Sequence, residues 1–340
     1  MASLKDVALL AGVSASTVSR SINSPEIVDP NTLQKVQLAM KKLNYRPNLM
    51  ASGLRAKNSK QIALIVPDAV HYTSASVIQY TSRRLQELGY TLLLGNHHNQ
   101  FETEAELLSN YFRRNIDGII LYLIYDEYRA IQSLLDQEER QVPIVVVGRR
   151  IRTPVFSNVT VDNYKAGLMA GEYLGSLGHT NVATLTGPKI TQWARDRLDG
   201  FEEGLSHYHA RLCWSFSQED LTDFDTGVLA AHRFLTAYPG ADRPTAIWAQ
   251  NDIMATGVLN VLLSAGLQIP RDLSLMGMDN IELSRMITPA LSTIHQPFDQ
   301  MANEAIRIIL ENNHSTDEQP QYVPIEPSLI VRDTTDVPRI

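Results

Sequence analysis

Eight short apolar runs, separated by helical stretches, constrain the fold of this chain more than any other feature. The first four read QIALIVP, YTLLLGN, IDGIILYLI and VPIVVVG, and the next four read NVATLTGP, ARLCWSFS, PTAIWAQ and DLSLMGM. Such continuous apolar runs are typical of parallel strands that helices cover on both faces. The two groups divide near residue 160, and LSTIHQP and a last run near 322–331 follow them. The pattern predicts an α/β core in which two similar halves each contribute parallel strands that are buried on both faces.

The first 60 residues differ from the rest in charge. They hold nine lysines and arginines and three acidic residues, a net charge of +6, in a chain whose formal net charge is −7. The other residues therefore sum to −13. A basic segment on an acidic body suggests that only this segment meets a polyanion such as nucleic acid, although a solvated charge pattern would look the same.

Three short helices are predicted within the basic segment. Ser3 and Asp6 have the spacing of a capping box, and Gly12 is a natural stop for the first helix. Ser14 can cap the second helix, and Asp29, followed by a proline, can cap the third. The apolar stripes are Leu4, Val7, Ala8 and Ala11 in the first helix, Val18 and Ile22 in the second, and Leu33, Val36, Met40 and Leu43 in the third.

Two helices joined by a glycine turn form a helix-turn-helix, and its second helix here reads VSASTVSRSIN. Five of these eleven residues carry hydroxyls, and only Arg20 is charged. A helix in the major groove needs small residues for close approach, hydroxyls that reach phosphates and an arginine that can contact guanine. The alternative is a helical bundle whose serine face meets only water, which the low helix propensity of serine explains poorly.

The remaining sequence argues against several classes of protein. Cys213 is the single cysteine, which rules out an intramolecular disulfide framework, and within its apolar run we expect it to be packed. No run approaches the ~20 apolar residues of a membrane span and no secretory leader opens the chain, so we expect a cytoplasmic protein. Nucleotide-binding, zinc-protease and nucleophile-elbow motifs are absent, so we predict no enzyme. His97 and His98 lack further ligands at metal-site spacing, and no metal or other cofactor is predicted.

A series of motifs follows in one order along nearly the whole chain, to about Arg332. They are LKDVALLAGVSASTVSRSIN, LNYRPN, LRAKNSKQIALIVPD, GYTLLLGN, IDGIILY, LGHTNVATLTGP, RDRLDGF, NDIMATGVL, DLSLMGMDN and PALSTIHQP. Each is weak alone, but together they are specific, and the chain resembles the lactose-repressor (LacI/GalR) family of transcription regulators. The resemblance implies a three-helix helix-turn-helix head, a hinge helix and a two-lobed core with two doubly wound parallel sheets, like that of periplasmic binding proteins.

The resemblance also implies domain boundaries. In chain order they are a DNA-binding domain at 1–47, a hinge helix and linker at 48–60, an effector-binding and dimerisation core at 61–333 and a short tail at 334–340. Within the core, the first lobe would hold about 61–160 and 292–320, and the second about 161–289 and 321–333.

The base-reading positions of the family fall on Ala15, Ser16 and Arg20. Arg20 would read guanine, whereas Ala15 could at most touch a thymine methyl group. The backbone-contacting positions fall on Thr17, Ser19 and Asn23.

The hinge helix of the family falls on residues 48–55. The resemblance implies that Asn48 and Ala51 contact DNA and that Leu54 wedges between base pairs in the minor groove, which would bend the duplex. The alternative for Leu54 is a linker residue buried against the body.

The effector-contacting residues implied in the core are Tyr72, Trp193, Arg197, Asn251, Asp279, Gln296 and Phe298. Asp279 would accept paired sugar hydroxyls, Arg197 would donate to sugar oxygens, and Asn251 would do both. Trp193 could stack on a sugar face, or it could equally pack in the core or make a contact between the lobes.

One departure from the family concerns the end of the fourth apolar run, where many relatives have an aspartate and this chain has Gly148. Without that carboxylate, the neighbouring Arg149 and Arg150 suggest an anionic ligand such as a sugar phosphate or a sugar acid. The alternative is that both arginines face solvent or a dimer partner.

Together these observations predict a repressor that binds a near-palindromic operator in double-stranded DNA as a homodimer. A small sugar or sugar derivative between the lobes would control it, and no membrane would be involved. The alternatives are a sugar-binding module without a DNA function and a sugar-modifying enzyme. No heptad stripe follows Asp333, which favours a dimer over a larger assembly.

Overall fold

The computed structural model describes residues 2–45, 59–98, 100–114, 116–122, 142–149, 156–218, 222–240, 242–312 and 319–339. The chain forms two compact units that divide between Ser59 and Lys60. The first unit is called the head below and the second the core.

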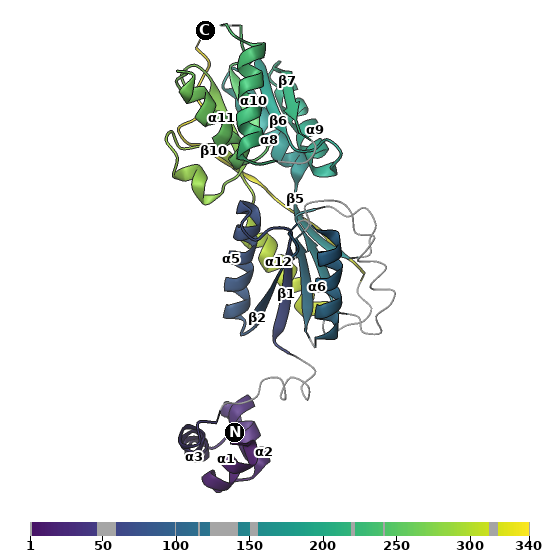
Figure 1. Ribbon diagram of the computed structural model, residues 1–340, viewed down its shortest axis with the longest axis vertical. Coiled ribbons are helices and arrows are strands. Elements are labelled where there is room, and N and C mark those ends of the chain that lie inside the picture. Colours follow the sequence, from purple (N-terminus) through teal and green to yellow (C-terminus); the bar gives the residue numbers. More distant parts are fainter. Residues whose placement is uncertain are drawn as a thin grey trace. The chain divides into compact units, whose positions relative to one another are not determined.

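The described residues of the head, 2–45, form a bundle of three helices and one short 3-10 helix (Figure 1). Its elements are α1 (Leu4–Ala11), α2 (Ala15–Asn23), η1 (Pro25–Ile27) and α3 (Pro30–Lys42). Val7, Ala8, Val18, Val36 and Ala39 are buried at its centre, which confirms most of the predicted stripes. The first 45 residues therefore have a small hydrophobic core of their own.

The predicted caps of the head helices are confirmed. Ser3 Oγ accepts from the N–H of Asp6 at 3.3 Å while Asp6 Oδ2 accepts from the N–H of Ser3 at 2.7 Å, a complete capping box. Gly12 ends α1 with φ of +68°, a left-handed conformation that favours glycine. The side chains of Ser14 and Asp29 cap the first turns of α2 and α3, where they accept from the N–H groups of Thr17 and Thr32.

The core contains two six-stranded sheets (Figure 1). The first sheet has the order β11-β5-β4-β3-β1-β2 and is parallel throughout. The second has the order β12-β10-β9-β8-β6-β7, and only β12 runs antiparallel. The strands are β1 (Gln61–Val66), β2 (Thr91–Asn96), β3 (Gly118–Tyr122), β4 (Ile144–Val147), β5 (Ser157–Val161), β6 (Asn181–Thr186), β7 (Arg211–Ser217), β8 (Ala246–Ala249), β9 (Ser274–Asp279), β10 (Ser292–His295), β11 (Tyr322–Ile325) and β12 (Ser328–Ile330).

Helices cover both faces of each sheet, which defines two lobes. Among the described residues, the helices of the first lobe are α5 (Tyr72–Glu87), α6 (Phe101–Arg113) and α12 (Phe298–Asn312), and those of the second are α8 (Asn163–Ser176), α9 (Gln192–Ser206), α10 (Phe224–Ala237), α11 (Asp252–Ser264) and η2 (Glu282–Arg285). Alternate residues of β1 pack in opposite directions: Ile62 and Leu64 lie in a cluster with α5 and α12, and Ala63 and Ile65 lie in a cluster with α6. This double burial explains why the strands read as continuous apolar runs.

The structure corrects the predicted assignment of strands to lobes. β10 pairs with β9 in the second sheet, although residues 292–320 were expected in the first lobe. β11 pairs with β5 in the first sheet, although residues 321–333 were expected in the second lobe. The chain therefore crosses between the lobes after β5, after β10 and after β11, and local sequence patterns do not encode such crossings.

Two further segments differ from the prediction. β5 was not predicted because its sequence SNVTV is largely polar; its buried Asn158 donates to the carbonyl of Val146 at 3.1 Å. The tail from residue 334 on was expected outside the core, but Thr334 is fully buried and its carbonyl accepts from the N–H of Leu275 at 2.8 Å. His179 Nε2 lies 3.1 Å from the carbonyl oxygen of Asp336, so the second lobe includes this part of the tail.

Cys213, which was expected to be packed, is exposed. It lies on β7, the edge strand of the second sheet, where side chains alternate between exposed and partly buried positions.

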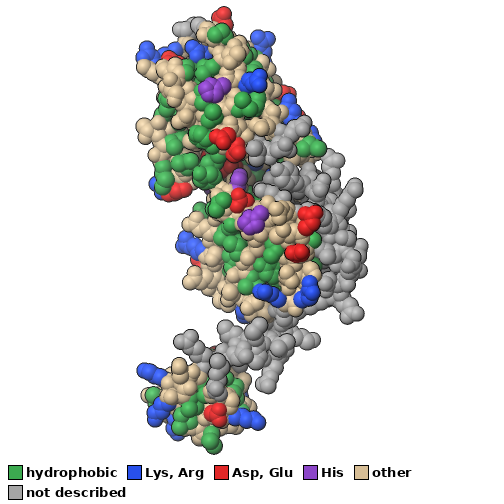
Figure 2. Space-filling model, in the orientation of Figure 1, with side chains coloured by type: hydrophobic (Ala, Val, Ile, Leu, Met, Phe, Trp, Pro, Cys, Tyr) green, Lys and Arg blue, Asp and Glu red, His purple; other side chains and the backbone are tan. Residues whose placement is uncertain are grey.

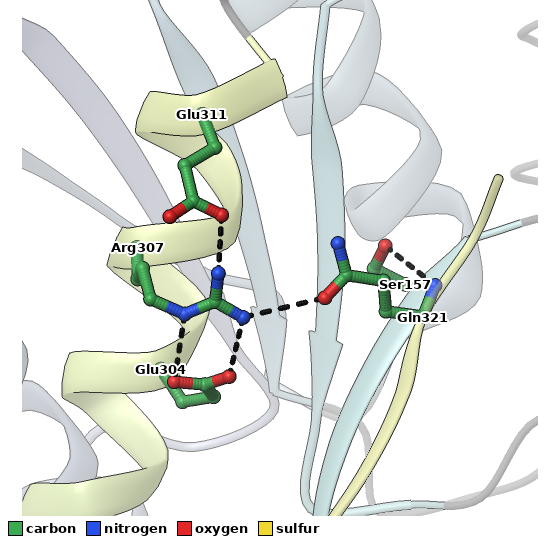
Figure 3. A network of polar contacts seen from close by, with 5 residues as sticks. All are labelled: Ser157, Glu304, Arg307, Glu311 and Gln321. Atoms are coloured by element: carbon green, nitrogen blue, oxygen red, sulfur yellow. Dashed lines mark hydrogen bonds and ion pairs between the residues drawn. The ribbon is translucent and has the colours of Figure 1, made fainter. Parts of the chain in front are cut away.

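A polar network joins α12 to the segment that leads into β11 (Figure 3). Arg307 binds Glu304 through Nε at 3.0 Å and Nη2 at 2.6 Å, and it also binds Glu311. Its Nη2 donates to Gln321 Oε1 at 3.3 Å, and the N–H of Gln321 donates to Ser157 Oγ on β5 at 3.1 Å. The network thus links α12 and the segment that follows it to β5, which is distant in sequence.

Candidate functional sites in the head and the core

Helix α2 presents the candidate DNA-contacting face of the head. Val18 is fully buried among residues of α1 and α3, whereas Ala15, Ser16 and Arg20 are exposed. The bundle thus holds one side of the helix, and the other side carries two small residues and a cation. This is the arrangement that a recognition helix requires.

Short polar groups at the start of α2 are linked to one another. Ser14 Oγ lies 2.7 Å from Ser16 Oγ and 2.9 Å from Thr17 Oγ1, and it accepts from the N–H of Thr17 at 3.1 Å. Thr17 and Ser19 are partly exposed, and Asn23 is the last residue of the helix. Hydroxyls that can donate, placed at the positive end of a helix, suit contacts with DNA phosphates.

Basic side chains are visible on the face of the head that Figure 2 shows, with fewer acidic ones.

The residues predicted for the hinge helix, Asn48, Ala51 and Leu54, lie outside the described residues, as does Arg150.

The second candidate site lies at the carboxyl ends of the core strands, the edge at which ligands of parallel α/β sheets bind. In the first lobe, Tyr122 ends β3 and Arg149 follows β4; in the second, Gln250 follows β8 and Asp279 ends β9. The two edges meet, because the guanidinium carbon of Arg149 lies 4.4 Å from the ring centre of Trp193 on α9. The site therefore draws on both lobes.

Arg197, on α9, is the buried cation of this site, with 6% of its surface exposed. Its Nε donates to Asn163 Oδ1 at 2.8 Å and its Nη1 donates to the carbonyl of Gln250 at 2.7 Å. Burial lowers the pKa of Arg197 to about 10, while the charge of Asp279 acts in the opposite direction. The guanidinium is therefore charged at neutral pH and is held in place by two neutral oxygens.

Asp279 is the buried carboxyl of the same site. Its Oδ1 accepts from Gln296 Nε2, and burial raises its pKa to about 6, opposed by Arg197, by the Gln296 hydrogen bond and by Arg149. Its φ of +116° is a strained conformation for a residue with a side chain, which costs about 1–3 kcal/mol. Strain of this kind concentrates at functional sites, and a fixed carboxylate beside a guanidinium can receive the hydroxyls of a sugar.

A second buried carboxyl, that of Asp252, fixes the strand ends behind Asp279. Its Oδ1 accepts from Thr293 Oγ1 at 2.6 Å and its Oδ2 accepts from the N–H of Ile281 at 2.9 Å. Burial and the proximity of Asp279 raise the pKa of Asp252 well above its ordinary value. Asp252, the first residue of α11, thus connects this helix to β10 through Thr293 and to the segment after β9 through Ile281.

Trp193 lies between the charged groups of the two lobes. The guanidinium carbons of Arg149 and Arg197 lie 4.4 and 4.6 Å from its ring centre, distances typical of cation–π contacts. Its ring edge packs against Gly187, where a Cβ atom would come within 2.0 Å of the indole. The ring makes the contact between lobes that was the alternative to stacking on a sugar.

A chain of hydrogen bonds supports the first-lobe side. Tyr122 Oη donates to Thr73 Oγ1 at 2.8 Å, and His71 Nδ1 lies 2.9 Å from the same oxygen. Burial raises the pKa of Tyr122, and Arg149, Asp279 and Arg197 act on it electrostatically, so the phenol lies near all three. Burial likewise lowers the pKa of His71, which favours its neutral form.

The other predicted effector residues have different surroundings. Asn251 caps α11: its side-chain oxygen accepts from the N–H of Met254 and its amide donates to the carbonyl of Thr222, both at 2.7 Å. Tyr72 begins α5 and is 47% exposed. Phe298 is only 4% exposed and packs in the core of the first lobe, because it begins α12, which lies against the sheet. The structure thus brings Trp193, Arg197, Asp279 and Gln296 together but does not place Phe298 among them.

Sequence reasoning missed several supporting residues: Thr73, Asn163 and Gln250. Their only signal was position, since Gln250 directly follows β8 and Asn163 opens the helix after β5. Their role depends on partners 34–53 residues away along the chain, which a local pattern does not reveal.

Two features are absent from the described residues. These residues contain no group of three or more His, Cys, Asp or Glu side chains that could hold a metal ion. No helix among them combines the length and the apolar character needed to cross a membrane.

Comparison with known proteins places the chain in a family. Residues 3–48 match the bacterial regulatory proteins of the lacI family, and residues 172–335 match a periplasmic binding protein-like domain. The HTH-type transcriptional repressor PurR of Escherichia coli O1:K1 / APEC is 33% identical over 333 residues, which cover 98% of this chain and 96% of that protein.

Solved structures agree with this assignment. The lac repressor dimer bound to operator and the anti-inducer ONPF has a TM-score of 0.84 at 26% identity, covering 98% of this chain and 99% of that one. The complex of the transcriptional regulator CelR with cellobiose has a TM-score of 0.71 at 26% identity, covering 98% of this chain and 100% of that one.

The chain belongs to the LacI family of bacterial regulatory proteins. It is a DNA-binding transcriptional regulator with a helix-turn-helix head and a periplasmic-binding-protein-like core, so the predicted family and fold class are confirmed. The relatives named above are regulators and repressors rather than enzymes, which agrees with the predicted class of function.

Proposed function

We propose that the protein is a repressor that binds a near-palindromic operator as a homodimer. A small sugar or sugar derivative, bound between the lobes of its core, controls whether the protein binds or releases the operator. The observation that carries the proposal is the α2 face, where exposed Arg20, Ser16 and Ala15 stand opposite the buried Val18. The relatives support it, since one is the lac repressor dimer on its operator and another is CelR with cellobiose. A repressor of this kind acts on DNA in the cytoplasm.

In the proposed complex, α2 enters the major groove. Arg20 donates two hydrogen bonds to guanine, while Ala15 and Ser16 allow close approach and tune the neighbouring bases. Thr17, Ser19 and Asn23 contact the phosphate backbone, which positions the head without reading sequence. One head on each half-site gives the operator the two-fold symmetry of the dimer.

The segment 48–60 links the head at 1–47 to the core in this proposal. Asn48 and Ala51 contact DNA, and Leu54 opens a central base step from the minor groove. A ligand in the core that favours one arrangement of the lobes changes how readily both hinge segments reach the DNA. A coupling of ~1–3 kcal/mol would change operator affinity about 5- to 150-fold.

The proposed effector site comprises Asp279, Arg197, Trp193, Asn251 and Gln296, with Tyr72 at its margin; Phe298, which packs in the core of the first lobe, is left out of it. Asp279, at the end of β9, and Arg197, on α9, support this role best. Both side chains are buried, and both act electrostatically on Tyr122 of the first lobe. Asn251 supports it through its place at the end of β8, although its side chain also caps α11.

The test is selection of an operator from random DNA followed by an electrophoretic shift titration. We expect Arg20→Ala to weaken binding of the selected operator by ~1–3 kcal/mol and to relax the preference at one base position in each half-site. Gln37→Ala, an exposed change on α3, is the control for folding of the head. Equal affinity and unchanged preference in Arg20→Ala would contradict the proposed recognition by α2.

A further inference from the structure

The turn that carries the Asp279 carboxyl has an unusual backbone. Asp279 ends β9 with φ of +116°, and Asn280 follows it with φ of +57°. Asparagine tolerates the second value, but the first is rare for any residue with a side chain. Such a conformation persists only where surrounding groups hold it, so the contacts of this turn show how the carboxyl is kept in place.

The two ends of the turn are bound by buried side chains. Gln296 Nε2 donates to Asp279 Oδ1, and the N–H of Gln296 donates to the Asp279 carbonyl at 3.3 Å. At the other end, Asp252 Oδ2 accepts from the N–H of Ile281 at 2.9 Å. These contacts hold the residues on either side of Asn280 but not its own side chain.

Arg332, which follows β12, binds the middle residue of the turn. Its Nη2 donates to Asn280 Oδ1 at 2.6 Å. The side-chain nitrogen of Asn280 lies 3.2 Å from His295 Nδ1, and His295 pairs with Asp279 in the register of β9 and β10. Because both ends of its amide are engaged, the Asn280 side chain fixes the backbone next to Asp279.

The same arginine binds the rest of the segment between β9 and β10. Arg332 Nη1 donates to the Leu291 carbonyl at 2.7 Å and to Ser284 Oγ at 3.2 Å. Ser284 lies in η2, and Leu291 directly precedes β10. One side chain thus contacts the start, the middle and the end of the segment 280–291, which suits the fixed fork of donors that a guanidinium offers.

We propose that Arg332 is a positioning residue of the effector site: it fixes the turn at Asn280 and so presents the Asp279 carboxyl to a sugar-sized ligand. The inference rests on the proposed function, because it assigns a role within the proposed effector site. Arg332 acts through Asn280 and Asp279 and does not touch the ligand. A carboxyl that is held in place before the ligand arrives binds it more tightly, because less conformational freedom is lost on binding.

The experiment is calorimetric titration of the full chain under conditions in which circular dichroism shows each variant to be folded. The probes are glucose, galactose, ribose, cellobiose, gluconate and glucose 6-phosphate, and the one that the wild type binds most tightly is used for the variants. We expect Arg332→Met to weaken its binding about tenfold or more, and Arg332→Lys to lose less, since an ammonium keeps part of the donors. Arg285→Met, which removes an exposed arginine of the same segment paired with Glu282, is the matched control and should bind as the wild type does.

A double-mutant cycle separates positioning from a general loss of stability. Asn280→Gly removes the side chain through which Arg332 acts, and glycine accepts the left-handed backbone. In this background we expect Arg332→Met to change the affinity by no more than about twofold. An equal loss in both backgrounds would mean that Arg332 supports the lobe without positioning Asp279, and it would overturn the inference.

The wild type and the single variant distinguish this inference from the proposed function. A wild-type chain that binds no probe rejects the proposed sugar effector, and the inference falls with it. A wild-type chain that binds a probe with an affinity that Arg332→Met leaves unchanged supports the proposed effector site and rejects the positioning role.

Discussion

The two lobes of the core each have a six-stranded sheet that is parallel apart from β12, but they differ in how their helices pack. In the second lobe α8 and α9 meet backbone to backbone, since a Cβ atom added at Gly167, Gly171, Gly200 or Gly204 would come within 2.0–2.3 Å of a carbonyl oxygen of the other helix. α10 and α11 meet in the same way through Gly227 and Gly257. The first-lobe helices α5, α6 and α12 contain no glycine and pack on the sheet through larger side chains.

The difference shows how the site is supported. Trp193 and Arg197 lie on α9, which the close contact with α8 fixes over its length. Arg149 instead comes from a loop after β4. The second lobe therefore provides a fixed surface of charge, whereas the first lobe contributes Arg149 from a loop.

The largest expected effect comes from breaking the helix contact of the second lobe. Gly200→Leu places a side chain where the Cβ alone would be 2.0 Å from the carbonyl oxygen of Tyr164. Because backbone cannot yield as a flexible side chain does, we expect a loss of about 3 kcal/mol or more in the free energy of unfolding. Urea unfolding measures this loss.

The control for this prediction is Gly240→Leu in the same lobe. No heavy atom lies within 4 Å of a Cβ built at Gly240, and its φ is not in the left-handed region. We expect a change below about 0.5 kcal/mol. A Gly200→Leu protein as stable as this control would show that α8 and α9 do not pack closely.

The sequence allowed prediction of those features that depend on local burial. The eight apolar runs became β1–β4 and β6–β9, and the caps at Ser3, Ser14 and Asp29 formed as expected. β5 was missed because its buried polar side chains are satisfied by distant partners such as the Val146 carbonyl. Hydrogen bonding to distant partners of this kind leaves no periodic signal along the chain.

The candidate site was predicted only in part for a similar reason. Asp279 and Gln296 were placed by resemblance and lie together in the structure. The contact of Arg149 with Trp193 joins two lobes whose positions depend on three chain crossings, and no local pattern encodes it. Phe298 begins α12, and its side chain packs in the core of the first lobe rather than in the candidate site.

The second expected effect concerns buried carboxyls, in which the lobes also differ. Asp279 of the second lobe has Arg197 nearby, but Glu104 of the first lobe lies on α6 with His97 Nε2 at 3.7 Å, and burial alone raises its pKa to about 7. The folded state therefore holds this proton more tightly than the unfolded state does. The resulting stability is present below the unfolded pKa of 4.5 and is lost as the pH rises through about 7.

Glu104→Gln removes this loss, because the amide is neutral at every pH. Relative to the wild type, we expect the variant to gain stability between pH 4.5 and 7 and to be about 1–3 kcal/mol more stable at pH 8. Thermal unfolding across this pH range measures the difference. Glu106→Gln, an exposed change on the same helix, should stay within about 0.5 kcal/mol of the wild type throughout. A Glu104→Gln protein that is less stable than the wild type at pH 8 would mean that the ionised carboxylate is favourably paired.

The smallest expected effect tests the polar network that joins α12 to the segment before β11 (Figure 3). Arg307 binds Glu304, Glu311 and Gln321, and the two carboxylates raise the pKa of its guanidinium. Its side chain is 42% exposed, so water competes with each ion pair. We expect Arg307→Met to lower the free energy of unfolding by less than about 1 kcal/mol, and the difference from the wild type to shrink further in 1 M salt.

Arg197 provides the contrast that gives this small value its meaning. Arg197→Met leaves the buried Asn163 Oδ1 and Gln250 carbonyl without their donor, which should cost about 2–4 kcal/mol and should respond little to salt. A larger loss of unfolding free energy in Arg307→Met than in Arg197→Met would contradict this expectation. It would mean that the exposed ion pairs of Arg307 stabilise the first lobe more than the buried hydrogen bonds of Arg197 stabilise the second. Urea unfolding of the two variants at low and high salt decides between these outcomes, since only the exposed pairs are screened.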